Sequence, residues 1–167
     1  MPSRSMNAPP KSKIVRSLDT LDGDLIGGIQ NSHIATLVER KSRFVLLACV
    51  DGKDTKSVVA ALTNKIQDLP EDLRRSLTWD RGGELADHKK LTIATDIKVY
   101  FCDPRSPWQR GSNENTNGLL RQYLPRNSNL YDHTQSDLDT IAEELNTRPR
   151  KTLGYHTPAA ILNEALH

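Results

Sequence analysis

The sequence contains only two cysteines, Cys49 and Cys102, and they form no CxxC pair. Both lie inside apolar runs, which predicts reduced core thiols of a reducing cytosol rather than a disulfide framework. Long hydrophobic runs are also missing: none approaches the roughly 18–20 apolar residues of a membrane span, and the N-terminus lacks the apolar segment of a signal peptide. We therefore expect a soluble cytoplasmic protein without a membrane partner.

A strong excess of charge of one sign is absent as well. The net charge is +2 at pH 7, from 23 Lys and Arg against 21 Asp and Glu, which is too small to indicate a nucleic-acid partner by itself. Zinc-ligand patterns, glycine-rich nucleotide loops and the GxSxG nucleophile motif do not occur. Any functional site must therefore be sought in the placement of individual polar residues.

The first 20 residues differ in composition from the rest of the chain. They combine several Pro and Ser with four basic residues and one acid, Asp19, a composition that cannot bury a hydrophobic core. We predict a flexible basic tail over residues 1–20 and one folded domain over residues 21–167, because a chain of this length supports a single core.

Apolar, β-branched runs come first in this domain and then alternate with segments of helical periodicity. An acidic, glycine-containing segment, residues 22–28, leads into the first of these runs. Strands are predicted over residues 34–40, 44–50, 77–80 and 97–101, and helices from Asp54 or Thr55 to before Pro70 and over 84–95, 112–124 and 135–146. This order predicts an α/β fold whose mixed central sheet of about five strands is flanked by helices.

Three acidic residues are candidates for a metal site: Asp24, Asp80 and Glu114. Asp24 lies near the start of the first strand and Asp80 ends a later one, and strand ends of an α/β sheet converge at one edge. Carboxylates suit Mg²⁺ or Mn²⁺, and two such ions promote in-line phosphoryl displacement. A chain with 21 acidic residues supplies many such triplets, so their spacing alone leaves a structural role open.

The segment around Glu114 favours the metal site. Arg110 and Arg121 lie four positions before and seven after this acid, so a helix would place all three on one face, with Asn117 between them. Structurally, such a face is a surface ion-pair ladder. Functionally, it is a metal ligand framed by phosphate clamps, because Arg suits bidentate phosphate contact.

Five segments closely resemble the catalytic region of DDE transposases, specifically the bacterial insertion-sequence family numbered thirty, which is similar to retroviral-type integrase cores. They are residues 23–26, 36–44, 77–82, 100–121 and 146–154. The resemblance implies a ribonuclease H-like fold, transposition by strand transfer of DNA, and a homo-oligomer in the active complex.

The same resemblance implies roles for individual residues. Asp24, Asp80 and Glu114 fall on the DDE positions, with 33 residues between the last two, and would hold two Mg²⁺ or Mn²⁺ ions. Arg110 and Arg121 fall on basic positions of the family signature.

Further candidate residues lie outside the triad. His88 could donate a hydrogen bond to a phosphate or a metal-bound water from behind the ligands, or simply pack on its helix. Trp108 either stacks on a DNA base or pins its loop. The basic cluster Arg148, Arg150 and Lys151 is interpreted as a contact to the DNA backbone, with a solvated surface cluster as the alternative.

The chain departs from the family pattern in two ways. Residues 20–22 replace the His-Trp-Glu run found in family members, and family members are much longer, with an N-terminal helix-turn-helix region. We therefore predict a truncated, fused or separately expressed catalytic core. Two alternatives stay open: a non-catalytic regulator or remnant that associates with full-length transposase, and a nuclease of the same fold that only hydrolyses DNA.

Overall fold

A computed structural model of the chain describes residues 20–79, 88–101 and 111–166, with the backbone alone described for residues 111–115. Its strands are β1 (Leu21–Gly27), β2 (His33–Glu39), β3 (Val45–Cys49), β4 (Ser76–Trp79) and β5 (Lys98–Phe101). Its helices are α1 (Thr55–Gln67), α2 (His88–Thr95), α3 (Gly111–Leu120), α4 (Gln135–Asn146) and α5 (Pro158–Leu166), with short 3₁₀ turns η3 (Glu71–Leu73), η6 (Leu130–Asp132) and η7 (Lys151–Leu153). None of the described helices is long and apolar enough to cross a membrane.

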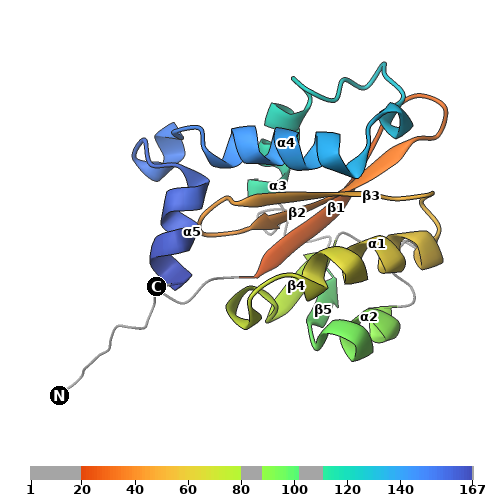
Figure 1. The fold of residues 1–167 in the computed structure, drawn as a ribbon, viewed down its shortest axis with the longest axis horizontal. Helices are drawn as coiled ribbons and strands as arrows, with labels where there is room; N and C mark the ends of the chain where they lie inside the picture. Colours follow the sequence, from red (N-terminus) through yellow and green to blue (C-terminus); the bar gives the residue numbers. More distant parts are fainter. Residues whose placement is uncertain (1–19, 80–87, 102–110, 167) are drawn as a thin grey trace.

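The five strands form one mixed sheet in the order β3-β2-β1-β4-β5 (Figure 1). β1, β2 and β3 pair antiparallel, whereas β4 pairs parallel to β1 and β5 pairs parallel to β4. In this register Asp24 lies opposite Thr36 of β2, and its neighbour Gly23 lies opposite Trp79 of β4. The predicted α/β fold with a mixed five-stranded sheet is confirmed.

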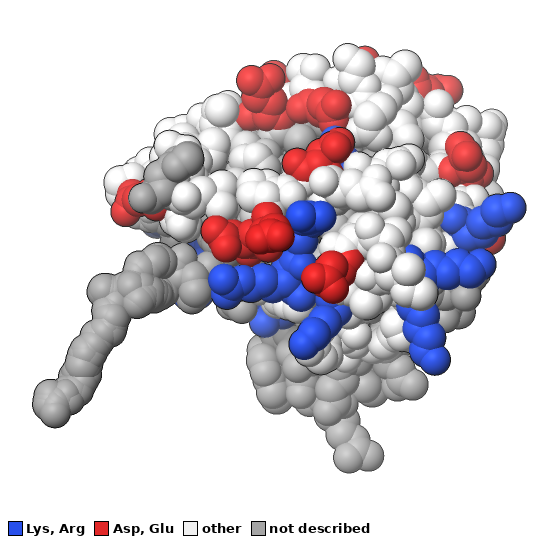
Figure 2. Space-filling model, turned by 60° about the horizontal axis from the view of Figure 1, so that its bottom comes forward, with Lys and Arg blue, Asp and Glu red and all other residues white. Residues whose placement is uncertain are grey.

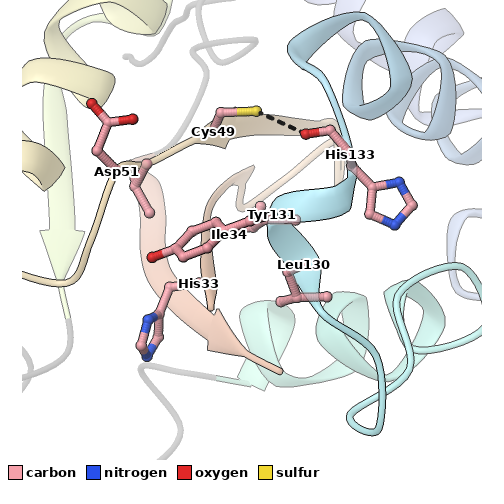
Figure 3. A pocket seen from close by; sticks show the side chains of 8 residues that line it. His33, Ile34, Cys49, Asp51, Leu130, Tyr131 and His133 are labelled. Carbon is pink, nitrogen blue, oxygen red and sulfur yellow. Dashed lines mark hydrogen bonds between the residues drawn. The ribbon is translucent and has the colours of Figure 1, made fainter. Parts of the chain in front are cut away.

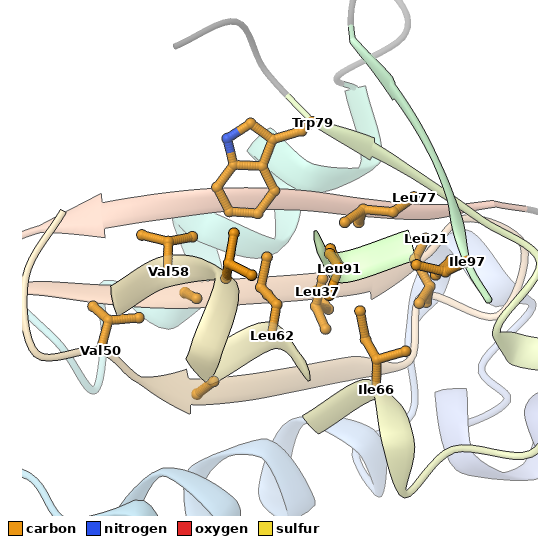
Figure 4. Close-up of a cluster of buried hydrophobic side chains, with 13 residues drawn as sticks. Leu21, Leu37, Val50, Val58, Leu62, Ile66, Leu77, Trp79, Leu91 and Ile97 are labelled. Atoms are coloured by element: carbon orange, nitrogen blue, oxygen red, sulfur yellow. The ribbon is translucent and has the colours of Figure 1, made fainter. Parts of the chain in front are cut away.

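Helices cover both faces of the sheet (Figure 1). α1 and α2 pack on one face through a buried cluster that includes Leu37, Leu62, Trp79 and Leu91 (Figure 4). α3 and α4 pack on the other face through a second buried cluster, to which Leu120 contributes from α3. Each fully buried side chain of this size contributes about 1.5–3 kcal/mol relative to exposure, so both helical layers are held by the sheet.

The first strand corrects a prediction. The segment 22–28 was expected to lead into the first strand, but it forms most of β1, so Asp24 is the fourth of seven strand residues rather than near the start. Two contacts make this possible: Arg40 Nη2 lies 2.8 Å from Oδ1 of the buried Asp22, and Gly23 leaves room for Trp79, since a Cβ at position 23 would come within 2.5 Å of the indole ring.

The predicted helices are confirmed within the described residues, and one helix was not predicted. α1 begins at Thr55 because the Asp54 side chain accepts a hydrogen bond from Ser57 N, and α4 has the predicted bounds. α3 ends at Leu120, four residues earlier than predicted. The unpredicted α5 begins at Pro158, whose fixed φ suits the first position of a helix, and packs at one end of the sheet (Figure 1).

The predicted tail lies outside the described residues except for Thr20. Its hydroxyl donates a hydrogen bond to Ser76 O at 3.1 Å, and its carbonyl accepts one from Arg40 N at 3.2 Å. These bonds fix the chain at the beginning of β1, beside β4.

Two amide side chains of α4 bind the backbone of the edge strand β3. Asn146 accepts a hydrogen bond from Val45 N at 2.8 Å and donates one to Val45 O at 2.9 Å. Gln135 accepts one from Cys49 N at 2.9 Å and donates one to Leu47 O at 2.8 Å. The backbone groups of an edge strand are thus used within the chain, which blocks pairing with another strand there.

Candidate active site

Asp24 projects from the middle of β1 toward α3. Its Oδ1 accepts a hydrogen bond from Leu25 N at 2.8 Å, and its Oδ2 accepts one from Asn117 Nδ2 at 3.3 Å. Asn117 follows Asp24 by 93 positions, so the contact depends on α3 packing against β1. The carboxylate is therefore oriented by a helix from a distant part of the chain.

A polar pocket of about 530 Å³ opens beside this carboxylate. It is lined by Asp24, Leu25, Ile26, Gly27, Asn117, Gly118, Arg121 and Arg126. The lining combines one carboxylate, one amide and two guanidinium groups. Such a combination can hold a phosphate group next to an acid-bound cation.

The two arginines of this pocket differ in their contacts. Arg121 Nη1 donates hydrogen bonds to Gly27 O at 2.9 Å and Leu124 O at 3.2 Å, which ties the end of α3 to the end of β1. Burial lowers the pKa of the Arg121 guanidinium, and the nearby charge of Arg126 lowers it further. Arg126 itself is exposed, so it is the more accessible cation of the pocket.

Several predicted site residues fall outside the described part of the chain. They are Asp80, Trp108 and Arg110; for Glu114 the backbone is described and the side chain is not. The Glu114 backbone lies in α3, one turn before Asn117. Asp80 is the residue after Trp79, which ends β4 and pairs with Gly23. The meeting of the three acids stays a prediction.

The surroundings of Asp24 fit a hard divalent cation. The pocket offers oxygen donors, and its lining contains neither cysteine nor histidine, which is the ligand chemistry that Mg²⁺ and Mn²⁺ prefer. Within the described residues no group of three His, Cys, Asp or Glu side chains could hold a metal ion. The two other proposed ligands, Asp80 and Glu114, contribute no described side chain to that search.

His88 is the first residue of α2 and packs against β5. Its ring lies 5.3 Å from that of Phe101 in an edge-to-face arrangement, with the ring planes at 82°. Its buried Nδ1 has no hydrogen-bond partner among the described residues. The packing alternative is thus observed, and a contact to the metal ligands stays a prediction.

The basic cluster at residues 148–151 does not line the pocket beside Asp24. Arg148 Nη2 donates a hydrogen bond to Tyr123 Oη at 2.6 Å, and its guanidinium lies 5.9 Å from the centroid of that ring. Arg150 is buried, with 7% of its surface exposed, whereas Lys151 is exposed at the start of η7. These residues occupy a second, separate basic region.

Sequence reasoning assigned no role to Arg126, although it lines the pocket. The excess of arginine around Glu114 was the only sequence feature that pointed to Arg126. Arg126 lies in the turn after α3, so helical spacing could not predict where its side chain lies.

A second cavity, of about 270 Å³, lies between the β2 start, the β3 end and η6 (Figure 3). There the Cys49 thiol donates a hydrogen bond to His133 O at 3.7 Å. Burial raises the pKa of this thiol, and the charges of Asp139, Asp137 and Asp51 raise it further. Since only a thiolate is a strong nucleophile, the raised pKa makes the Cys49 thiol less reactive near neutral pH.

Comparison with known proteins identifies the type of domain. The integrase core domain family matches residues 12–107. The transposase InsI for insertion sequence element IS30A of Escherichia coli is 57% identical over 151 residues, which cover 90% of this chain and 39% of the transposase. The chain thus spans about two fifths of the length of this relative.

Two solved structures share the fold. The catalytic core domain of BIV integrase has a TM-score of 0.69 and 22% identity, and the alignment covers 89% of this chain and 95% of that one. A chain of the simian T-cell lymphotropic virus intasome in complex with PP2A regulatory subunit B56 gamma has a TM-score of 0.65 and 20% identity, with 85% of this chain and 53% of that one covered. The implied ribonuclease H-like fold is confirmed.

Proposed function

Because this chain belongs to the integrase core domain family and has a core of the IS30 transposase type, we propose that it is the metal-dependent catalytic core of a DNA transposase. It cleaves phosphodiester bonds at transposon ends and joins the freed 3′-hydroxyl to target DNA. The observation that carries the proposal is the Asp24 carboxylate, oriented by Asn117 in a pocket with Arg121 and Arg126.

The proposed metal ligands are Asp24, Asp80 and Glu114, holding two Mg²⁺ or Mn²⁺ ions. Bound ions of this kind activate the attacking oxygen and stabilise the leaving oxygen of a phosphoryl transfer. Asn117 and Leu25 N fix the two oxygens of Asp24, so this carboxylate needs little rearrangement when a cation binds. This orienting contact to Asp24 adds a second role to the DNA contact predicted for Asn117.

The proposed DNA contacts are electrostatic. Arg126 is accessible in the pocket. Arg121 adds positive charge, and its hydrogen bond to Gly27 O joins the end of α3 to the end of β1. Arg110, Trp108, Arg148, Arg150 and Lys151 are proposed as further contacts along the DNA. We also propose that the chain acts on cytoplasmic DNA as a homo-oligomer, which the fold shared with a chain of an intasome supports.

A joining assay tests the function. The protein is incubated with Mg²⁺ or Mn²⁺, a supercoiled target plasmid and a labelled duplex that carries an element end with a free 3′-hydroxyl. Wild type is expected to give label joined to plasmid, and Asp24→Asn and Glu114→Gln are expected to reduce joining by about 10²–10³-fold. Asp72→Asn, which changes an exposed acid of η3, is the matched control.

Each alternative predicts a different result. Hydrolysis of the duplex without joined product, even when an end-binding domain is supplied, would identify a nuclease. Joining that persists in Asp24→Asn and Glu114→Gln would exclude the proposed carboxylates. A protein that forms no product but lowers the activity of a full-length transposase would be a regulator.

A further inference from the structure

Three arginines gather where α4 ends beside the β2–β3 turn; we call Arg43, Arg148 and Arg150 the arginine cluster. The two hydrogen bonds between Asn146 and Val45 bring these segments together. Arg43 precedes Val45 by two positions and Arg148 follows Asn146 by two. Residues far apart in sequence thus contribute to one basic site.

The positive charge of the arginine cluster has no acidic partner in the described part of the chain. The ion pairs found there join Arg40 to Asp22, Lys65 to Asp139 and Arg75 to Asp72. No described side chain accepts a hydrogen bond from Arg150, although only 7% of its surface is exposed. The guanidinium nitrogens of Arg150 are not among the enclosed, unpartnered polar atoms of the described residues. An anion can therefore reach a cation that has lost most of its contact with solvent and has no counter-ion.

The electrostatics agree with this geometry. Burial lowers the pKa of the Arg150 guanidinium, and the neighbouring guanidinium groups of Arg43 and Arg148 lower it further. Mutual repulsion of this kind is relieved by an anion that contacts several guanidinium groups together.

The Tyr123 ring holds the side chain of Arg148, and backbone hydrogen bonds hold the chain at Arg150 and Arg43. Arg150 N donates to His156 O at 3.0 Å, and Arg150 O accepts from Tyr155 N at 2.8 Å. Arg43 has a φ of 65°, an uncommon conformation for a residue other than glycine, and its N donates to Glu39 O at 2.8 Å. This hydrogen bond closes the turn between β2 and β3 and fixes the backbone position from which the Arg43 side chain extends.

We infer that the arginine cluster is a binding site for a single phosphate group of the DNA backbone, separate from the catalytic pocket. Guanidinium groups match the geometry of phosphate oxygens, and three of them from two chain segments define one position for it. Arg148 is bonded to Tyr123, two positions after Arg121 of the catalytic pocket. The pocket lies toward the Gly27 end of β1, and the cluster lies toward the Leu21 end, where β2 turns into β3. A DNA backbone that runs along β1 would contact both. The inference that this phosphate belongs to DNA rests on the proposed function. The inference that the cluster binds a phosphate group is independent of that function.

Inorganic phosphate tests the chemistry without DNA. Phosphate is expected to raise the Tm of the full chain above that in chloride of equal ionic strength, and Arg150→Met is expected to lose at least half of this shift. Replacing an unpaired buried charge by an apolar side chain of similar length need not weaken the fold. If Arg150→Met does not fold, Arg43→Asn removes a cluster charge with a residue that tolerates positive φ. Arg75→Gln is the matched control, because Arg75 is an exposed arginine that follows η3 and lies outside the arginine cluster.

Duplex DNA then tests the source of the phosphate. Fluorescence anisotropy with a labelled 30-base-pair duplex in EDTA gives the slope of log K against log salt concentration, which changes by about 0.9 for each phosphate that the protein no longer neutralises. Arg43→Asn, Arg148→Gln and Arg150→Met are each expected to weaken binding and flatten the slope by up to that amount. Because all three arginines are proposed to share one phosphate, the double variant Arg43→Asn/Arg150→Met should flatten the slope by no more than about 0.9 in total.

The outcomes separate this inference from the proposed function. Equal stabilisation by phosphate in wild type and in Arg150→Met or Arg43→Asn would overturn the arginine cluster as a phosphate site, even if joining activity is intact. Loss of joining activity with the phosphate response preserved would contradict the proposed function alone. Variants that keep the salt slope of wild type but change the oligomeric state in sedimentation would assign the cluster to a partner carboxylate and overturn the DNA contact.

Discussion

Asn117 gives Asp24 a fixed direction at the scale of a single side chain. The amide holds Oδ2 while Leu25 N holds Oδ1, so each carboxylate oxygen has an assigned donor. Groups that orient a metal ligand from behind commonly control metal affinity and activity. The amide of α3 is therefore part of the proposed catalytic apparatus although it carries no charge.

Replacing this amide should impair the reaction more than the fold. We expect Asn117→Ala to lower joining activity or apparent Mg²⁺ affinity by about 10–100-fold, because Asp24 loses the donor to Oδ2. The measurement is the joining rate as a function of Mg²⁺ concentration, with Tm recorded in parallel.

Gln122→Ala is the matched control, since Gln122 is exposed just after α3 and does not line the pocket beside Asp24. It should keep full activity and change the free energy of unfolding by less than about 0.5 kcal/mol. Equal activity of Asn117→Ala and wild type across the Mg²⁺ titration would contradict the orienting role.

Cys49 is expected to react slowly with alkylating agents. Burial and nearby carboxylates raise the pKa of its thiol, so the neutral thiol prevails to a higher pH than in an unfolded chain. In a Cys102→Ser background, iodoacetamide should modify Cys49 at least about threefold more slowly than a free cysteine near pH 8.5.

The sign of the linked stability follows from the same shift. A raised thiol pKa stabilises the fold below the pKa of the unfolded cysteine, and this contribution disappears as the pH rises through the folded-state value. Urea should restore the ordinary alkylation rate. Fast alkylation of the folded protein at neutral pH would contradict the raised pKa.

At the scale of elements, α4 protects the edge of the sheet as well as covering its face. We expect Asn146→Ala to lower the free energy of unfolding by about 1–3 kcal/mol for each buried group of Val45 left unpaired. Urea unfolding monitored by circular dichroism measures this change.

Glu144→Ala provides the control on the same helix, since Glu144 is exposed. It should change the unfolding free energy by less than about 0.5 kcal/mol. A similar small effect of Asn146→Ala would show that water replaces the amide at Val45.

The contrast between α4 and β1 explains what the sequence could predict. The bounds of α4 follow from local signals, since Thr134 and Asp137 form a capping box at its start. β1 depends on distant partners, because Asp22 needs Arg40 and the room left by Gly23 is filled by Trp79. Aspartate and glycine are poor strand formers by themselves, so local propensity pointed away from the strand.

The candidate site shows the same division between local and distant information. Helical spacing correctly placed Asn117 on α3, one turn after Glu114. Its hydrogen bond to Asp24 could not be predicted, because it depends on how α3 packs against β1 across 93 positions of sequence. Arg126 and Arg43 lie in turns, where no periodic pattern indicates the direction of a side chain.

At the scale of the whole molecule, a small net charge conceals an uneven distribution. Figure 2 shows basic side chains in the lower and right-hand parts of one face, and acidic side chains mainly in its upper part. Local potential rather than net charge governs the approach of DNA. The sequence total of +2 therefore understates how basic some parts of the surface are.

Metal binding should stabilise the entire fold if the carboxylates form a site. Mg²⁺ at 100 times its Kd would add about 2.7 kcal/mol, so we expect Tm to rise by several degrees. Differential scanning fluorimetry with Mg²⁺ and Mn²⁺, against KCl of equal ionic strength, measures the shift, and Asp24→Asn should abolish it. An identical Tm with and without millimolar Mg²⁺ or Mn²⁺ in wild type would contradict the site.

The sheet topology also has a consequence for protein synthesis. β1, β2 and β3 are consecutive and pair as neighbours, so a growing chain can assemble them soon after they leave the ribosome. Asn117 and Glu114 are translated much later, and α3 must then close a long loop back onto β1. A nascent chain consequently carries Asp24 in the sheet while Asn117 and Glu114 are still missing, so the proposed catalytic set is complete only after translation has passed α3.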